Sequence, residues 1–325
     1  MKKLYCNIKT AKYFSIHFSV AIAIALLLGS CGGSKQTQTG DYPIHVLIYK
    51  KPDASKKDFD AWVSNVLDRY TNVKKINTCN YCDNELMMLE ISDPNQVTNL
   101  KDTNNTVIGG SKGKKVTSAD ICASLCGPGK TGCPIFCMPN GPIGLPKSNP
   151  SAANNNSGAQ LNNEENNKKS VIIAVLDTGI DPDKLNSFTK DSNSKSKKSA
   201  PQVSSLGLNI QSASHSSNWK DDHPNAHGTM IAKAIVTQSP ASFGKITLLP
   251  IKTYDQAGTT DLFTSLCGVA YAAKNGADYI YVGELENYAK PNSSELLQNF
   301  FQQYIPKSNN LSKGNGASAR LFQLR

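Results

Sequence analysis

An aspartate and a histidine, fifty residues apart, are the residues of this chain whose types and surroundings best suit acid–base chemistry. Asp177 ends an apolar run and precedes Thr-Gly in the segment Val171–Asp181 (VIIAVLDTGID). His227 opens the segment His227–Ile231 (HGTMI), where a helical pattern begins. A histidine that acts as a general base offers one ring nitrogen to a nucleophile and donates the other to a buried carboxylate, which fixes the tautomer and stabilises the imidazolium. The two segments supply both groups.

The elements that must position this pair alternate between strand and helix. Continuous apolar runs predict strands covered on both faces, and apolar residues at helical spacing predict the helices between them. Strands separated by helices imply right-handed crossovers and a parallel sheet. Active side chains in such sheets lie at the carboxyl ends of strands, where Asp177 is expected. The predicted order is strand Val171–Leu176, helix His227–Thr237, strand Ile246–Lys252, helix Asp261–Asn275 and strand Ala277–Val282.

Asp-Thr-Gly alone is ambiguous, because aspartic proteases use the same tripeptide, but they need two facing carboxylates and this chain has one copy. With His-Gly-Thr downstream, the region Val171–Gly283 resembles the subtilisin-like serine proteases (subtilases). The resemblance implies that Asp177 is the orienting carboxylate and His227 the general base, acting on a peptide or protein substrate. The sequence points to no cofactor and to no metal-ligating residues in this region, and it is silent on calcium sites. His215 and His223 lack the following Gly-Thr and are expected to be surface residues. The matching segments are Val175–Asp181, Asn225–Thr229, Leu249–Lys252 and Gly268–Ala273.

The family's nucleophile motif, Gly-Thr-Ser-(Met/Ala)-Ala at the start of a buried helix, has no match in this chain. Ser318 in Gly-Ala-Ser-Ala is the nearest imitation, but only seven residues follow it, too few for that helix. Gly314–Gly316 resembles the family's oxyanion-hole segment weakly. Where the family has Asn-(Met/Leu)-Ser-(Leu/Met)-Gly after an isoleucine in the strand lining the cleft, Ile280 is followed by Tyr281–Glu284. The substrate-binding wall therefore departs from the family as well.

The final residues also differ in composition from the rest. Two of the three arginines, Arg320 and Arg325, fall in the last six positions, and no acidic residue follows Glu295. A shifted reading frame or premature termination would explain this, and chance is the alternative. We therefore expect a subtilisin-like serine endopeptidase by family, in a chain that stops before its nucleophile and is inactive as printed. The alternative is a pseudoprotease lipoprotein that acts as a peptide-binding or interaction module.

The N-terminus predicts export. Four lysines among the first twelve residues precede Phe18–Leu28, an apolar run of eleven residues that is too short to span a bilayer. The segment Leu28–Cys31 (LGSC) resembles the lipobox of bacterial lipoproteins. That resemblance implies lipidation of Cys31 and anchoring to a membrane of the cell envelope, inner or outer. A plain signal peptide is the alternative.

A small α/β domain is expected next. Ile44–Tyr49 predicts a strand, Ser55 and Asp58 a capping box, Phe59–Tyr70 an amphipathic helix, and Glu85–Ile91 a second strand. A small α/β domain before a subtilisin-like domain resembles the inhibitory propeptides of that family. An accessory domain of unrelated role is the alternative.

Nine cysteines fit an exported protein. Cys6 lies in the signal, Cys31 is the lipidation candidate and Cys267 stands isolated. We expect the other six to form up to three disulfides, with a zinc site as the alternative because cysteines in pairs are typical zinc ligands. These six are Cys79, Cys82, Cys122, Cys126, Cys133 and Cys137.

The net charge of +10 is diffuse and not interleaved with aromatic residues, which argues against nucleic acid as a partner. The expected fold class is α/β, with an incomplete, parallel-sheet subtilisin-like core and a small N-terminal α/β propeptide-like or accessory domain. The expected order is signal peptide 1–30, tether 31–42, small α/β domain 43–100, Cys-rich segment 101–140, disordered Asn/Ser-rich linker 141–170, partial subtilase domain 171–310 and atypical tail 311–325.

Overall fold

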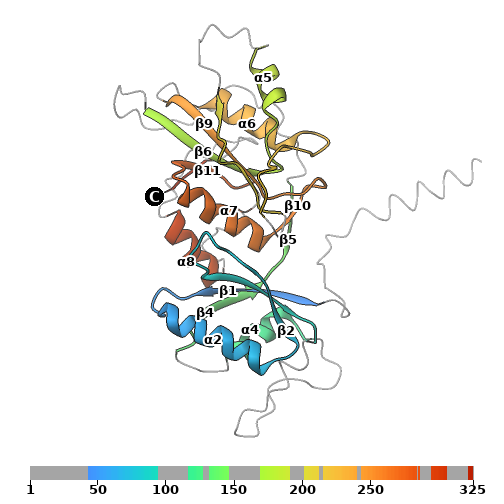
Figure 1. The fold of residues 1–325 in the computed structure, drawn as a ribbon, viewed down its shortest axis with the longest axis vertical. Helices are drawn as coiled ribbons and strands as arrows, with labels where there is room; N and C mark the ends of the chain where they lie inside the picture. Colours follow the sequence, from blue (N-terminus) through green and yellow to red (C-terminus); the bar gives the residue numbers. More distant parts are fainter. Residues whose placement is uncertain are drawn as a thin grey trace, which may run out of the picture. The chain divides into compact units, whose positions relative to one another are not determined.

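The structure is a computed structural model that describes residues 43–93, 116–126, 132–145, 169–190, 201–211, 215–239, 243–283, 285, 294–305 and 321–324. These residues form a mixed α/β structure with one largely parallel sheet and two antiparallel sheets (Figure 1). The N-terminal subdomain comprises the described residues up to 139, and the C-terminal subdomain those from 169 on. The expected signal and tether, Cys31 included, lie outside the described residues. Within the described part of the chain, no helix has the length and apolar character to cross a membrane.

The N-terminal subdomain is a four-stranded antiparallel sheet, in the order β2-β3-β1-β4, with two helices. The predicted serine N-cap is confirmed, and the rest of the capping box differs: Ser55 Oγ accepts a hydrogen bond from Asp58 N at 3.1 Å, and the Asp58 carboxylate accepts from Ser55 Oγ at 2.6 Å. The elements are β1 (Ile44–Lys50), α2 (Lys56–Arg69), β2 (Val73–Thr78), β3 (Leu86–Ile91), α4 (Ser118–Cys126) and β4 (Ile135–Pro139).

Strand β1 is buried on both faces. Val46 and Ile48 pack in one cluster with apolar residues of α2 and α4, while Leu47 and Tyr49 pack in another with residues of the C-terminal subdomain. All four side chains are almost fully buried. Because side chains alternate across a strand, burial on both faces accounts for the unbroken apolar run in the sequence.

The second half of the Cys-rich segment belongs to this sheet. Strand β4 pairs with β1. Two disulfides join α4 to β4 and to the residues just before β4: Cys122 to Cys137 and Cys126 to Cys133. Their Cα–Cα distances are 5.4 and 5.6 Å. Residues 94–115 and 127–131 lie outside the described residues.

The predicted set of paired cysteines is wrong at two positions. Cys79 bonds to Cys267, which the sequence had set aside, and Cys82 is a buried free thiol. The pairing is set by the tertiary structure. The turn between β2 and β3 packs against the helix that carries Cys267, although 188 residues separate the two cysteines in the sequence. The zinc alternative loses its donors, because only Cys82 of the described cysteines keeps a thiol.

The C-terminal subdomain is built on a six-stranded sheet. Its main path runs β12-β11-β6-β9-β7, and β8 also pairs with β9. Strands β7, β8, β9, β6 and β11 pair in parallel, and β12 joins the edge antiparallel. Its elements are β6 (Lys169–Asp177), α5 (Pro182–Lys190), β7 (Gln202–Val203), β8 (Leu208–Asn209), α6 (His227–Gln238), β9 (Phe243–Lys252), α7 (Leu262–Lys274), β11 (Tyr279–Tyr281), α8 (Glu295–Tyr304) and β12 (Phe322–Gln323).

This sheet is covered on both faces, as the apolar runs predicted. Ile173 and Val175 of β6 share a core cluster with α5 and α6, whereas Ala174 and Leu176 share one with α7 and α8. The five elements predicted from Val171 onward are all present, and the parallel sheet is confirmed. The short strands β7, β8 and β12 and the helices α5 and α8 were not predicted.

Two short strands lie where the sequence predicted irregular chain. Strand β5 (Pro142–Gly144), inside the expected linker, pairs with β10 (Thr259–Asp261). Strand β12, inside the expected atypical tail, pairs with β11. Backbone pairing with a neighbouring strand orders both segments, and each adds a buried apolar side chain, Ile143 or Leu324, to the core. Residues 146–168 of the linker and 306–320 of the tail lie outside the described residues.

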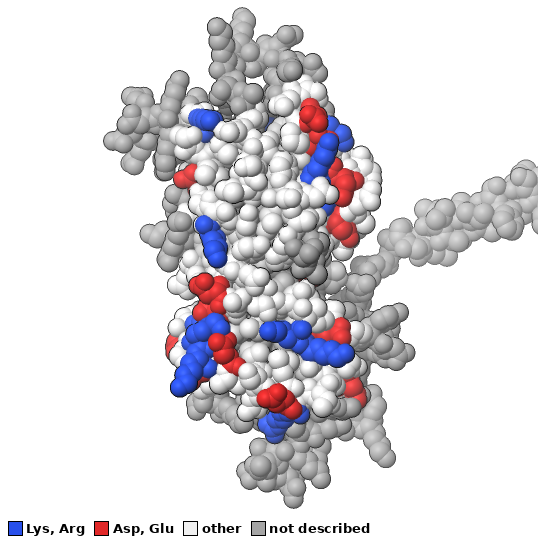
Figure 2. All heavy atoms as spheres, viewed as in Figure 1, with Lys and Arg blue, Asp and Glu red and all other residues white. Residues whose placement is uncertain are grey.

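The surface charges are mixed in sign. On the face drawn in Figure 2, Lys and Arg side chains lie among Asp and Glu side chains rather than in one continuous basic area. One such pair, Lys56 and Asp60 on α2, is exposed and four residues apart, so it contributes little to stability.

Candidate active site

Asp177 and His227 meet at the end of the central strand. Asp177 is the last residue of β6 and His227 the first of α6. Asp177 Oδ1 lies 2.8 Å from His227 Nδ1, and the side chains are only 1% and 5% exposed. The structure therefore brings the two predicted site residues into direct contact at the carboxyl end of a parallel strand.

Two glycines allow this contact. Gly179 has φ +111°, a left-handed conformation that L side chains rarely adopt, and turns the chain away from β6. A Cβ on Gly228 would overlap the carbonyl oxygen of Gly179 and lie 3.1 Å from Asp177 Oδ1. Gly179, two residues after Asp177, and Gly228, directly after His227, thus let the two turns touch.

A buried polar network holds the two turns together. Thr178 Oγ1 donates to Asp221 Oδ1 and accepts from Gly228 N, both at 2.9 Å. Thr229 donates to Asp221 Oδ2 through its backbone nitrogen at 2.9 Å and its hydroxyl at 2.7 Å. Asp221 thus bridges the threonines of both motifs. Sequence reasoning missed this role, because Asp221 lies in a polar loop with no apolar pattern around it.

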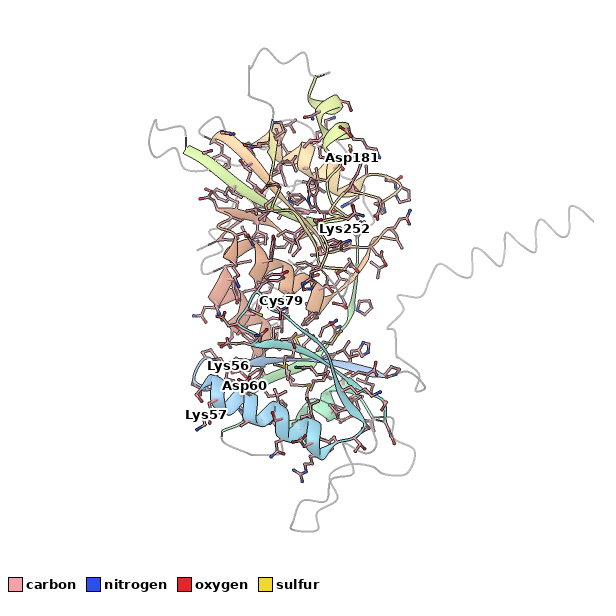
Figure 3. All side chains as sticks on the ribbon, viewed as in Figure 1. Lys56, Lys57, Asp60, Cys79, Asp181 and Lys252 are labelled. Atoms are coloured by element: carbon pink, nitrogen blue, oxygen red, sulfur yellow. A yellow bond between two sulfur atoms is a disulfide. The ribbon has the colours of Figure 1, made fainter. Side chains whose placement is uncertain are left out.

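Lys252 supports the same turn from the next strand. It is the last residue of β9, in register with Asp177, and is almost fully buried (Figure 3). Its ammonium donates to the carbonyl oxygen of Thr178 at 2.9 Å and to the Asp222 carboxylate. A buried ammonium with both partners in place fixes the backbone that follows Asp177.

The environment of His227 favours its charged form. Burial opposes protonation, but the hydrogen bond and charge of Asp177, helped by the charge of Asp221, outweigh it and raise the pKa of His227 above its ordinary 6.5. Protonated His227 therefore stabilises the folded chain fully below pH 6.5, and this contribution is lost as pH rises through the higher pKa of the folded state.

Asp177 and His227 each have one side-chain atom that forms no hydrogen bond. His227 Nε2 and Asp177 Oδ2 are buried and have no hydrogen-bond partner in the structure. Asp177 Oδ1, the oxygen that contacts His227, accepts a second bond from Thr178 N at 2.7 Å, which helps to fix its position. The imidazole is thus oriented through Nδ1, and Nε2 is the atom available to accept a proton.

His215 and His223 are half-buried. His223 stands edge-on to His227, with ring centroids 6.2 Å apart. His215 stacks on Tyr81 of the N-terminal subdomain, and its Nδ1 lies 3.1 Å from the Tyr81 hydroxyl. Burial lowers the pKa of His215. The expectation of surface residues therefore holds only in part, because each ring packs against another aromatic ring, which the polar composition of the segment does not reveal.

Among the described residues, no side chain forms a hydrogen bond with His227 Nε2. Ser318 and Gly314–Gly316 lie outside the described residues, so their positions as weak candidates stay a prediction. The altered cleft segment is partly described: Tyr281 and Val282 are buried, and Gly283 has φ +53°.

An extended segment lies along β10. Pro142–Gly144 pair antiparallel with Thr259–Asp261, and Leu145 N donates to Gly258 O at 2.9 Å. A Cβ on Gly258 would lie 2.7 Å from Leu145 Cδ1 and 3.6 Å from His223 Nε2. The chain leaving the N-terminal subdomain therefore lies near the histidine that stands beside His227.

Comparison with known proteins adds no relative. No protein-family model matches the chain, and no curated protein matches it. The acid–base pair and its network rest on the geometry given above.

Proposed function

We propose that the C-terminal subdomain is a subtilisin-like serine-endopeptidase domain, with Asp177 as the orienting carboxylate and His227 as the general base. The observation that carries this proposal is the buried contact of 2.8 Å between Asp177 Oδ1 and His227 Nδ1. A histidine with a purely structural role would be expected to satisfy both ring nitrogens once buried. His227 satisfies one and leaves Nε2 unpaired.

The geometry suits the chemistry of a serine hydrolase. In the proposed reaction, His227 Nε2 takes the proton of a serine hydroxyl as the oxygen attacks a peptide carbonyl, and later returns it to the leaving amine. Asp177 keeps the proton on Nδ1 and stabilises the imidazolium. Asp221 and Lys252 position the backbone of the two turns and do not touch the reacting atoms.

The N-terminal subdomain is part of the same proposal, as a propeptide-like element. Its outgoing segment Pro142–Leu145 lies on β10 by backbone hydrogen bonds, which is how extended peptides are recognised at sheet edges. We propose that this segment occupies the place of a peptide substrate.

A second candidate is an inactive peptide-binding module. This candidate is favoured by the pairing of β10 with the extended segment Pro142–Gly144, because binding through backbone pairing needs no serine. In this reading Asp177 and His227 are retained for structure: they bond to each other, Asp177 accepts from Thr178 N, and Thr178 Oγ1 accepts from Gly228 N.

The electrostatic state of the pair is directly testable. We expect Asp177→Asn to lower the pKa of His227 from above 6.5 to below it, because burial then acts without the opposing carboxylate. Titration of the histidine ring by NMR measures this. Asp183→Asn is the matched control, since that carboxylate is 92% exposed and should leave the His227 pKa unchanged. An unaltered His227 titration in Asp177→Asn would contradict the assigned pairing.

A fluorophosphonate probe separates the two candidate functions. It bonds its phosphorus to a base-activated serine oxygen and releases fluoride, while the base takes the proton. We expect the protein isolated from cells that express the gene to be labelled at a Gly-Thr-Ser-x-Ala serine, with loss of label in His227→Ala. Coding DNA around the Arg325 codon, read in all frames, identifies that motif independently. Absence of both label and motif would select the binding module.

We further propose that the protein is a lipid-anchored, exported bacterial protein, on the strength of the basic start, the short apolar run and LGSC at residues 28–31. Expression in a bacterium with labelled palmitate should give a labelled, membrane-bound chain. Cys31→Ala should abolish label and release the protein. Equal labelling of the variant would refute the lipid anchor.

A further inference from the structure

One disulfide joins the two subdomains. Cys79 follows β2 in the N-terminal subdomain, and Cys267 lies in α7 of the C-terminal subdomain (Figure 3 labels Cys79). Their Cα atoms are 5.6 Å apart, and neither side chain is exposed. A covalent bond between the subdomains therefore lies inside their shared apolar core.

Aromatic contacts surround this bond. Tyr49 of β1 meets Phe300 of α8 with ring centroids 5.4 Å apart, and Tyr81 meets Tyr271 of α7 at 4.7 Å. Tyr49 also donates a hydrogen bond to Gln303. The disulfide thus reinforces an interface that is already packed.

A third cysteine stands beside the disulfide. Cys82 follows Cys79 by three residues in the turn before β3, and its thiol donates to the Cys79 carbonyl oxygen at 3.4 Å. Cys82 is the free cysteine of the described chain, 2% exposed. The Cys-x-x-Cys spacing is one at which two cysteines form a disulfide in redox-active proteins.

We propose that Cys79, Cys82 and Cys267 form a thiol–disulfide latch between the subdomains. In the closed state the Cys79–Cys267 bond holds the N-terminal subdomain on α7. To open it, the Cys82 thiol loses its proton and its sulfur attacks Cys79 Sγ. A Cys79–Cys82 disulfide forms, and Cys267 leaves as a thiolate that takes up a proton. The exchange consumes no oxidant or reductant.

The latch is closed while the interface is intact. Exchange needs a thiolate, and burial, aided by the charges of Glu85 and Asp83, raises the pKa of Cys82 to about 12 against the opposing backbone hydrogen bonds. Opening of the turn that carries Cys82 would let water reach the thiol, so that burial would no longer raise its pKa. The proposal holds whether or not the C-terminal subdomain is a peptidase. If the C-terminal subdomain is a peptidase, a cut between residues 146 and 168 would leave the propeptide-like subdomain attached to it through the Cys79–Cys267 bond.

The experiment uses the full chain with a specific-protease recognition sequence inserted after Asn156. After cleavage, the chain is unfolded at acidic pH in the presence of N-ethylmaleimide, so that buried free thiols are blocked before they can exchange, and the product is analysed without reductant. We expect one covalent species joined by Cys79–Cys267, with label on Cys82 alone among Cys79, Cys82 and Cys267. Two separate pieces, or no Cys79–Cys267 peptide by mass spectrometry, would overturn the proposal.

Opening is then tested in moderate denaturant without added thiol, followed by the same block. Wild-type protein should split into two pieces, with a Cys79–Cys82 peptide and label moved to Cys267. Cys82→Ser, and Cys82→Ala should the first fail to fold, should remain one species under the same treatment. Cys267→Ser should separate after cleavage alone. Wild-type protein that stays joined while its Cys82 becomes labelled in the opened state would disprove the exchange.

Discussion

The purified chain, as printed, is expected to hydrolyse peptides no faster than buffer. Among the described residues, no side chain is hydrogen-bonded to His227 Nε2, and the printed sequence contains no Gly-Thr-Ser-x-Ala motif. The prediction is therefore that the base has no serine to activate and that no acyl-enzyme forms. In subtilisin, loss of the serine alone lowers kcat by about 2 × 10⁶, nearly as much as loss of the whole triad. A deficit of that order puts turnover below detection in a standard peptide assay.

The assay compares the mature chain, made soluble by Cys31→Ala, with His227→Ala and Ser318→Ala versions against a broad peptide library. All three should give the same background. Turnover at typical enzyme rates, on the order of 1–10³ s⁻¹, that is lost in both variants would make Ser318 the nucleophile and the prediction wrong. Turnover that survives His227→Ala would point to a contaminating protease.

The acid–base pair was predictable because its signals are local. An apolar run that ends in Asp-Thr-Gly fixes where β6 stops, and a helical pattern that opens with His-Gly-Thr fixes where α6 starts. The parallel order of strands then puts the end of β6 at the active edge of the sheet. The spacing of Leu296, Leu297, Phe300 and Phe301 was an equally local signal, sufficient to predict α8.

The remaining features depend on contacts between distant parts of the chain. Asp221 is one acid among several in a polar loop, and only the fold reveals that it receives hydrogen bonds from Thr178 and Thr229. The partner of Cys79 is set by the packing of the β2–β3 turn on α7, which no spacing of cysteines encodes. Strand β5 contains Pro and Gly and forms because β10 offers it an edge.

Gly228→Ala is expected to destabilise the fold and break the acid–base pair together. The added methyl would overlap the Gly179 carbonyl oxygen, and both partners are backbone of buried turns, so neither can move without displacing Asp177 or His227. Overpacking of this kind costs about 3 kcal/mol, the upper end of the usual range. For a domain of this size that lowers Tm by roughly 6–12 °C.

The same substitution should lower the pKa of His227, because separating the turns weakens the Asp177 hydrogen bond that raises it. Gly141→Ala is the matched control: a Cβ there meets no atom within 4 Å and its φ is not left-handed, so both Tm and the His227 pKa should stay as in wild type. Thermal unfolding and NMR titration of the two variants give both quantities. A Gly228→Ala protein as stable as Gly141→Ala would mean that the two turns are not in contact. That result would also refute the assigned contact between Asp177 and His227.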